Sequence, residues 1–141
     1  MAANRTFLGS VHRNVPEQIE LPAAATGLLP GMLGLRTATT LKAHDVADGG
    51  GFVYVVKELT SGGTVDDAYT AGDTAQAYIP HSGEMYQMLV ATGQNLDIDS
   101  PLTSNGAGLL VLTDAGTDVV VCYSDEDVTT SATTKVRVKF K

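Results

Sequence analysis

The polar stretch 68–102 contains residues that could do chemistry, because His81 stands beside Ser82 among carboxylates and glycines. A serine hydrolase would use the histidine as a general base and the serine hydroxyl as the nucleophile. Neighbouring side chains on a strand point to opposite faces, however, and the chain has no G-x-S-x-G elbow. The pair does not predict a catalytic site, and we expect no enzyme and no catalytic residue.

The residue types that bind metals or cofactors are scattered along the chain. The histidines at positions 12, 44 and 81 lack the close spacings of zinc sites. The sequence DIDS at 97–100 begins like a calcium loop, but proline and leucine occupy its fifth and sixth positions. Cys122, the only cysteine, lies in an apolar run that favours a buried thiol. We therefore expect no metal and no cofactor.

The charged residues are distributed unevenly. The net charge is -7, yet all nine basic residues lie in 1–57 or in the last seven positions. Residues 58–134 contain twelve acidic residues and no Lys or Arg. One interpretation is a solvated acidic surface that keeps the protein soluble. The other is an acidic body whose basic ends dock on an acidic partner. Both disfavour nucleic-acid binding, because an acidic body repels phosphate.

The apolar pattern predicts short strands separated by turns. Leu33 and Leu35 begin one strand, with Thr37 as a candidate third position, and Phe52–Val56 is a second β-prone run. Met85–Val90 fits a strand or a short helix, and the flanking glycines favour the strand. Asn105-Gly106 is a strong hairpin signal. Together these features predict an all-β fold, a small barrel or sandwich.

The N-terminal residues lack the periodicity of a strand or helix. Pro16, Pro22 and Pro30 lie within fifteen residues and favour an extended path. We therefore expect an extended arm over residues 1–22 and a single β-barrel domain over 23–141. No secretory signal and no apolar run long enough to span a bilayer is visible, so we expect a soluble protein made in a cytoplasm.

The last seven residues, KVRVKFK, alternate strictly between basic and apolar side chains. This pattern predicts a strand with one buried face and one basic face. Two interpretations stay open. The basic side chains could protect an edge strand from unwanted pairing, or they could form a docking surface.

The order of features over residues 17–140 resembles the capsid cement, or decoration, proteins of tailed bacteriophages. A polar arm precedes IELPAAATGLLPGMLGL, the turn DGGGF follows, and the blocks AGDTAQAYIPHSGE and SNGAGLLV come before a short basic terminal strand. The resemblance implies a small β-barrel or β-tulip, often trimeric, without catalytic residues. It also implies binding to the outside of an assembled head, bridging of major capsid subunits, and a location on the capsid exterior.

The residue-level features fit this role. A proline-rich arm can add main-chain hydrogen bonds to a neighbour, and many copies sum modest contacts. The expected partners are the major capsid protein and further copies of the chain, a trimer being favoured, with no nucleic acid and no membrane. Candidate interface residues lie in the arm and the last strand: Arg5, Arg13, Ile19, Leu21, Lys135, Arg137 and Lys139.

A second function from a different class is a virion-surface module that binds a carbohydrate or another ligand. Such a module would need a pocket lined by aromatic rings, and the candidates are Tyr54, Tyr69, Tyr78 and Tyr86. These tyrosines are sparse and scattered, so we favour the structural role.

Overall fold

The computed structural model describes residues 6–9, 16–114 and 116–141, and every regular element in these ranges is a strand. The all-β prediction is confirmed, and the described part of the chain contains no long apolar helix that could cross a membrane. The strands are β1 Phe7–Gly9, β2 Gln18–Pro22, β3 Leu33–Arg36, β4 Leu41–Ala43, β5 Tyr54–Val56, β6 Thr74–Tyr78, β7 Met85–Val90, β8 Asn95–Leu96, β9 Pro101–Ser104, β10 Leu110–Leu112, β11 Cys122–Ser124, β12 Val128–Thr129 and β13 Thr134–Lys139.

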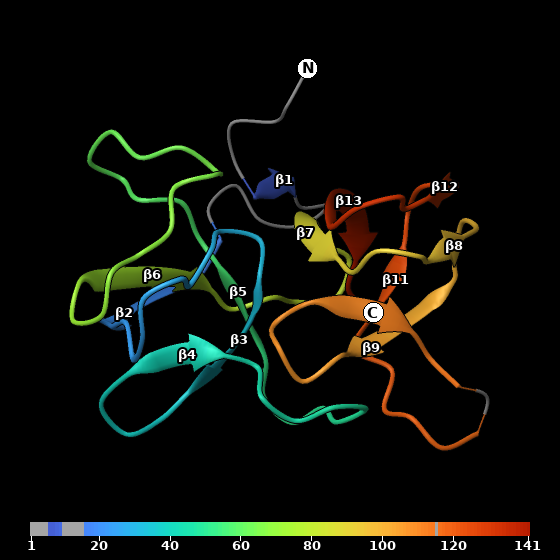
Figure 1. Cartoon of the computed structure of the whole chain (residues 1–141), viewed down its shortest axis with the longest axis horizontal. Helices are drawn as coiled ribbons and strands as arrows, with labels where there is room; N and C mark the ends of the chain where they lie inside the picture. The colour runs from blue at the N-terminus through green and yellow to red at the C-terminus, as the bar shows by residue number, and fades with distance from the viewer. Residues whose placement is uncertain (1–5, 10–15, 115) are drawn as a thin grey trace.

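Five strands of the C-terminal half close into a small barrel, in the order β7-β10-β9-β11-β13 and back to β7 (Figure 1). The antiparallel ladder between β7 and β13 is the longest, with six paired positions. A parallel contact between Leu110 and Val90 closes the barrel. β9 and β10 form the hairpin predicted from Asn105-Gly106, and Gly106 has a φ of 82°, which glycine adopts without strain. The small β-barrel fold is therefore confirmed.

The N-terminal half forms a second sheet of five strands, in the order β2-β6-β5-β3-β4. All its pairings are antiparallel. An isolated bridge joins Ala23, just after β2, to Leu41 at the start of β4. Since β2 and β4 are the outermost strands of this sheet, their contact means that the sheet is strongly bent. In Figure 1 this sheet and the barrel stand side by side as two lobes, with β8 and β12 pairing as a short ribbon at the outer end of the barrel lobe.

Two apolar cores explain the burial pattern of the strands. The larger one fills the barrel with side chains such as Met88, Leu102 and Val138, and Val55 of the second sheet packs against it. The smaller core lies on the other face of the second sheet and includes Tyr69. β5 is buried throughout because its alternate side chains enter different cores. The second sheet is thus a layer between two apolar clusters.

Gly31 joins the two lobes through its main chain. Its N–H donates to the Val56 carbonyl at 2.9 Å, and its carbonyl accepts from Leu89 N–H at 2.9 Å. Its φ is 86°, and a Cβ at this position would lie 3.1 Å from the Gln87 carbonyl oxygen. A side chain would therefore be strained here and would crowd β7, so this junction favours glycine.

Two segments differ from the sequence prediction. Thr37 does not continue the first predicted strand: its N–H donates to the Thr40 carbonyl at 2.8 Å, which closes a tight turn and returns the chain as β4. Residues 18–22 of the expected arm are extended, as predicted, but they form β2 and pair with β6 at five positions. Their proline, Pro22, stands at the strand's last residue on a sheet edge, where a missing N–H is tolerated.

Candidate docking surfaces

β13 shows the predicted two faces, but it is not an edge strand. Val136 and Val138 are buried in the barrel, while Lys135, Arg137 and Lys139 are partly exposed on its outside. β11 and β7 pair with β13 on its two sides. The edge-protection interpretation is therefore wrong, and the main chain of β13 is not available for a partner's strand over these pairings.

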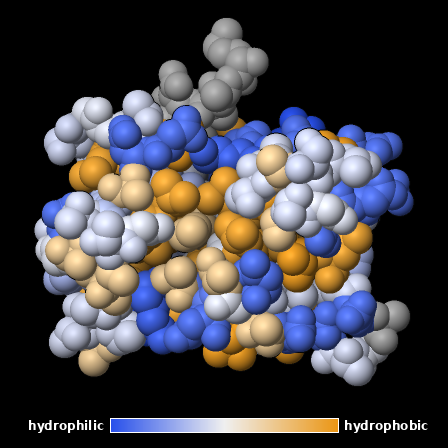
Figure 2. Space-filling view, viewed as in Figure 1, coloured by the Kyte–Doolittle hydropathy of each residue, from blue (hydrophilic) through white to orange (hydrophobic). Residues whose placement is uncertain are grey.

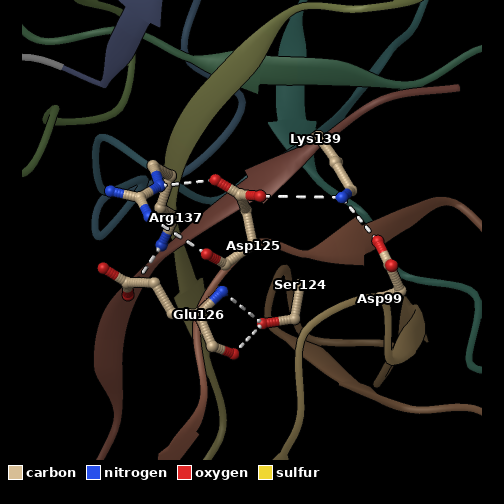
Figure 3. A network of polar contacts seen from close by, with 6 residues as sticks. All are labelled: Asp99, Ser124, Asp125, Glu126, Arg137 and Lys139. Atoms are coloured by element: carbon tan, nitrogen blue, oxygen red, sulfur yellow. Dashed lines mark hydrogen bonds and ion pairs between the residues drawn. The ribbon is translucent and has the colours of Figure 1, made fainter.

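Acidic side chains pair with the three cations of β13, and Figure 3 shows the pairs made by Arg137 and Lys139. Arg137 Nε lies 2.7 Å from Asp125 Oδ2, and its Nη2 donates to the Asp125 carbonyl at 3.1 Å. Lys139 Nζ lies 2.5 Å from Asp99 and 3.6 Å from Asp125. Lys135 Nζ contacts Asp66 at 2.5 Å. Each of the three candidate cations of β13 thus has an intramolecular carboxylate partner.

The turn after β11 positions the carboxylates of Asp125 and Glu126 beside β13. Ser124 Oγ donates to the Glu126 carbonyl at 2.7 Å and accepts from Glu126 N–H at 3.3 Å. Asp125 N–H donates to the Arg137 carbonyl, which extends the β11–β13 ladder by one bond. Arg137 N–H then donates to the Glu126 carboxylate at 3.1 Å. The Glu126 side chain therefore accepts the hydrogen bond that a main-chain carbonyl would accept if the ladder continued, and this bond holds the turn beside the cations.

The ion pairs change the charge that this face offers to a partner. The hydrogen bond from Arg137 lowers the pKa of Asp125, and the hydrogen bond to Asp99 raises the pKa of Lys139. Both shifts favour the charged forms. Lys135, Arg137 and Lys139 pair with Asp66, Asp125 and Asp99, and a fourth carboxylate, that of Glu126, accepts from the main-chain N–H of Arg137. The face is therefore not basic overall, and charge gives it no preference for an acidic partner.

The predicted arm residues lie elsewhere in the fold. Ile19 and Leu21 are half-buried and pack against the smaller core. Beside them, Glu20 accepts a hydrogen bond from Gln76 Nε2 at 2.5 Å. Arg5 and Arg13 lie outside the described residues. The structure thus places Ile19 and Leu21 on the second sheet and the three cations on the barrel, rather than in one cluster.

The groups considered for chemistry have structural environments. His44 is fully buried, with Nε2 3.1 Å from the Gly50 carbonyl oxygen. His81 Nε2 lies 2.8 Å from Glu17. Cys122 is buried, and desolvation raises the pKa of its thiol, which disfavours the reactive thiolate. Among the described residues no three His, Cys, Asp or Glu side chains form a group that could hold a metal ion.

The four tyrosines of the carbohydrate hypothesis are core residues. Tyr69 and Tyr86 are fully buried, and Tyr54 and Tyr78 are nearly so. Tyr86 OH donates to the Glu84 carboxylate at 2.6 Å. A sugar needs an accessible ring face on which to stack, and these rings are covered by other side chains. The tyrosine-lined pocket that the carbohydrate hypothesis would need is therefore not formed by these four residues.

A cleft of about 910 Å³ lies between segments of the two lobes. Its apolar lining is Leu29, Met32, Val65, Leu89 and Leu109, and the Lys135–Asp66 ion pair stands at its polar side. Figure 2 shows apolar residues gathered in the middle of the face drawn, between more polar flanks. The lining offers contact area for an apolar group, and its cation Lys135 is already paired with Asp66.

No family model and no curated protein matches this chain. Among solved structures it is similar to the head fiber gp8.5 N base of bacteriophage phi29, with a TM-score of 0.54 and 14% sequence identity. The superposition covers 90% of this chain and 95% of the other. At this identity the similarity shows a shared fold. It extends over almost the whole length of both chains, so it includes the barrel and the second sheet together.

Proposed function

We propose that this protein is a structural component of a bacteriophage virion that binds the outer surface of the assembled capsid. There it stabilises the head by bridging major capsid subunits. The observation that carries the proposal is the fold shared over nearly the full chain with a phage head fiber base. The resemblance of the sequence blocks to capsid cement proteins is an independent reason for the same proposal.

The site geometry supports a binding role rather than a catalytic one. His44, His81 and Glu84 are engaged in structural hydrogen bonds or ion pairs. The fold instead offers strands fixed by two cores and several surface loops, a rigid scaffold on which loops can contact a partner. Many identical copies on one head would sum modest contacts into strong overall binding, and a trimeric assembly of the protein would have the same effect.

Co-sedimentation with empty expanded heads of the same phage tests this function. We expect the purified protein to pellet with heads at a fixed stoichiometry and to raise the temperature at which the heads disrupt. Unassembled major capsid protein is the control, because bridging requires neighbouring subunits. Absence from the head pellet, or binding that leaves head disruption unchanged, would contradict the proposal.

The contribution of the N-terminal arm needs a narrower test than deletion of residues 1–21. That deletion would remove most of β2, Thr6, whose N–H donates to Glu58, and β1, whose Phe7 packs on Tyr78 and Tyr86. The double substitution Arg5→Ala and Arg13→Ala keeps all the residues that make these contacts. If the arm docks on an acidic capsid surface, this variant will bind heads more weakly and with a smaller dependence on salt.

A further inference from the structure

Large apolar side chains are exposed at one pair of loops. Among the described residues, five large hydrophobic side chains are exposed, and four of them lie in the loops 44–53 and 113–121. These four are Val46, Phe52, Val119 and Val120, and Phe52 is 68% exposed. The fifth, Ile98, lies in a different loop and is 61% exposed. We call the four residues the apolar tip.

The two loops of the apolar tip are in contact. Val119 N–H donates to the Asp48 carbonyl at 3.1 Å. A Cβ at Gly50 would lie 2.5 Å from Val119 Cγ1, and one at Gly49 would lie 2.6 Å from Val46 Cγ1. Gly50 of DGGGF therefore lets the two loops approach closely, a role in addition to the turn geometry that the sequence indicates. Val46 lies against Gly49 and Val119 lies against Gly50, so the two valines cover neighbouring residues of one loop.

Interior hydrogen bonds brace both loops against the fold. Asp48 N–H donates to the Ser104 carbonyl at 2.8 Å, and Val121 N–H donates to the Leu102 carbonyl at 2.8 Å. The buried His44 ring contacts the Gly50 carbonyl at 3.1 Å. Asp48 adopts a φ of 57°, a conformation that aspartate accepts more readily than most residues. The apolar side chains are thus held outward by a preorganised main chain, which lowers the entropic cost of docking.

Acidic residues flank the apolar tip without cations in the same segments. Residues 43–53 and 113–121 contain Asp45, Asp48, Asp114 and Asp118 and no Lys or Arg. Asp45 forms an ion pair with Lys42 at 2.5 Å, and the Asp118 carboxylate accepts hydrogen bonds from Asp114 N–H and Thr117 Oγ1 within its own loop. A second copy docking tip to tip would bring like charges together, which disfavours self-association through this surface. A partner with basic residues around an apolar hollow would match both features.

We propose that the apolar tip docks on a protein surface that has an apolar hollow rimmed by Lys or Arg. This inference rests on the proposed function, so the partner is the outer surface of the major capsid subunit. Burial of Phe52 and the valines supplies the contact area, and the acidic flanks select the orientation and accelerate association at low salt. The capsid-facing surface is then this pair of loops rather than the basic strand β13.

The test compares the double variant Phe52→Ser/Val119→Ser with the control Ile98→Ser. All three side chains are exposed, so each variant should keep the thermal unfolding temperature of the unaltered protein. Titration onto empty heads should show at least a tenfold weaker affinity for the double variant and less than about a twofold change for the control. Asp48→Asn keeps a residue that tolerates positive φ and should reduce the salt dependence of binding.

The outcomes separate the two proposals. If the unaltered protein binds heads and the double variant binds equally well, the apolar tip is not the docking surface and the proposed function stands. If the unaltered protein does not bind heads, both proposals are overturned. If sedimentation shows that the double variant loses self-association while head binding is unchanged, the tip contacts a second copy, which also overturns this inference.

Discussion

The outer face of β13 and the apolar tip are the two surfaces that best suit a partner. The sequence favours β13 as the docking surface, whereas the structure favours the apolar tip. The sequence of β13 alternates basic and apolar residues and predicts a cationic docking face. In the fold, its cations pair with Asp66, Asp99 and Asp125. The tip arises from a glycine-rich turn and from a loop that ends in three valines, and these two contacting loops carry four exposed apolar side chains.

The difference teaches that the character of a surface depends on which residues the fold brings beside it. A charged side chain that already has a partner gains little from a second one, because its attraction is partly satisfied and must be broken first. An exposed apolar side chain has no such competitor, and its burial removes unfavourable contact with water. The predictions below test this contrast, from the largest expected effect to the smallest.

The largest contrast is between apolar residues inside and outside the barrel. Met88→Ala removes a fully buried side chain from the barrel core and should lower the free energy of unfolding by about 2–5 kcal/mol. Phe52→Ala removes a larger but exposed side chain and should change that free energy by no more than about 0.5 kcal/mol. Urea unfolding measures both. A large loss for Phe52→Ala would show that the tip stabilises the fold instead of serving a partner.

A buried carboxyl gives the next largest effect. Glu84 is 1% exposed and accepts hydrogen bonds from Tyr86 OH at 2.6 Å and His81 N–H at 3.0 Å. Glu84→Ala would leave the Tyr86 hydroxyl buried and unpaired, so it should lower the free energy of unfolding by about 1–3 kcal/mol.

Glu84→Gln is the matched control for that substitution. Glutamine keeps an acceptor oxygen for both donors. Its amide nitrogen replaces the second carboxylate oxygen, Oε1, which has no hydrogen-bond partner among the described residues. The same urea titration should give a smaller loss for glutamine than for alanine. Equal losses would indicate that the negative charge, rather than the accepted hydrogen bonds, stabilises this site.

Much of the fold was predictable from the sequence because local patterns agree with the tertiary contacts. Asn105-Gly106, the run Met85–Val90 and the alternation of the last strand each specify one turn or strand, and each is present. Strand order was not predictable, because it depends on long-range pairing. The barrel closes through the pairing of β7 with β13, and the second sheet includes residues 18–22, which lack a strong strand pattern.

The candidate surfaces were harder to predict for the same reason. The carboxylates that neutralise β13 stand at positions 66, 99 and 125, so no window of sequence contains the ion pairs. The apolar tip depends on contact between two loops about seventy residues apart, and a run of valines such as 119–121 is also typical of a buried strand. The weak available signal was Phe52 beside three glycines, a bulky residue in a turn.

The ion pair of Asp125 with Arg137 predicts a small dependence of stability on pH. The pair lowers the folded-state pKa of Asp125 below its unfolded value near 3.9. Its contribution is therefore fully present above that unfolded pKa and is lost as pH falls through the folded pKa. At pH 7, Asp125→Asn should lower the free energy of unfolding by about 0.2–1 kcal/mol, because both side chains are partly exposed.

Thermal unfolding between pH 7 and pH 2 measures this effect. The difference between the unaltered protein and Asp125→Asn should shrink as pH falls below about 4 and should vanish at the acidic end. Asp127→Asn, two residues away and exposed, is the control for a general change in charge. A difference that stays constant over the whole range would mean that the pair is not the source of the stabilisation.

Removal of a single β13 cation should have the smallest effect, a slight weakening of the binding to heads. Lys135→Gln and Lys139→Gln each remove one cation that an aspartate already satisfies, so either substitution should weaken binding to heads less than about twofold. The tip variant Phe52→Ser/Val119→Ser, titrated in the same experiment, should weaken it at least tenfold. If the lysine variants instead produce the larger loss, the cations leave their intramolecular carboxylates to contact the capsid. The basic strand would then be the docking surface despite its pairing, and the contrast between the two surfaces would be reversed.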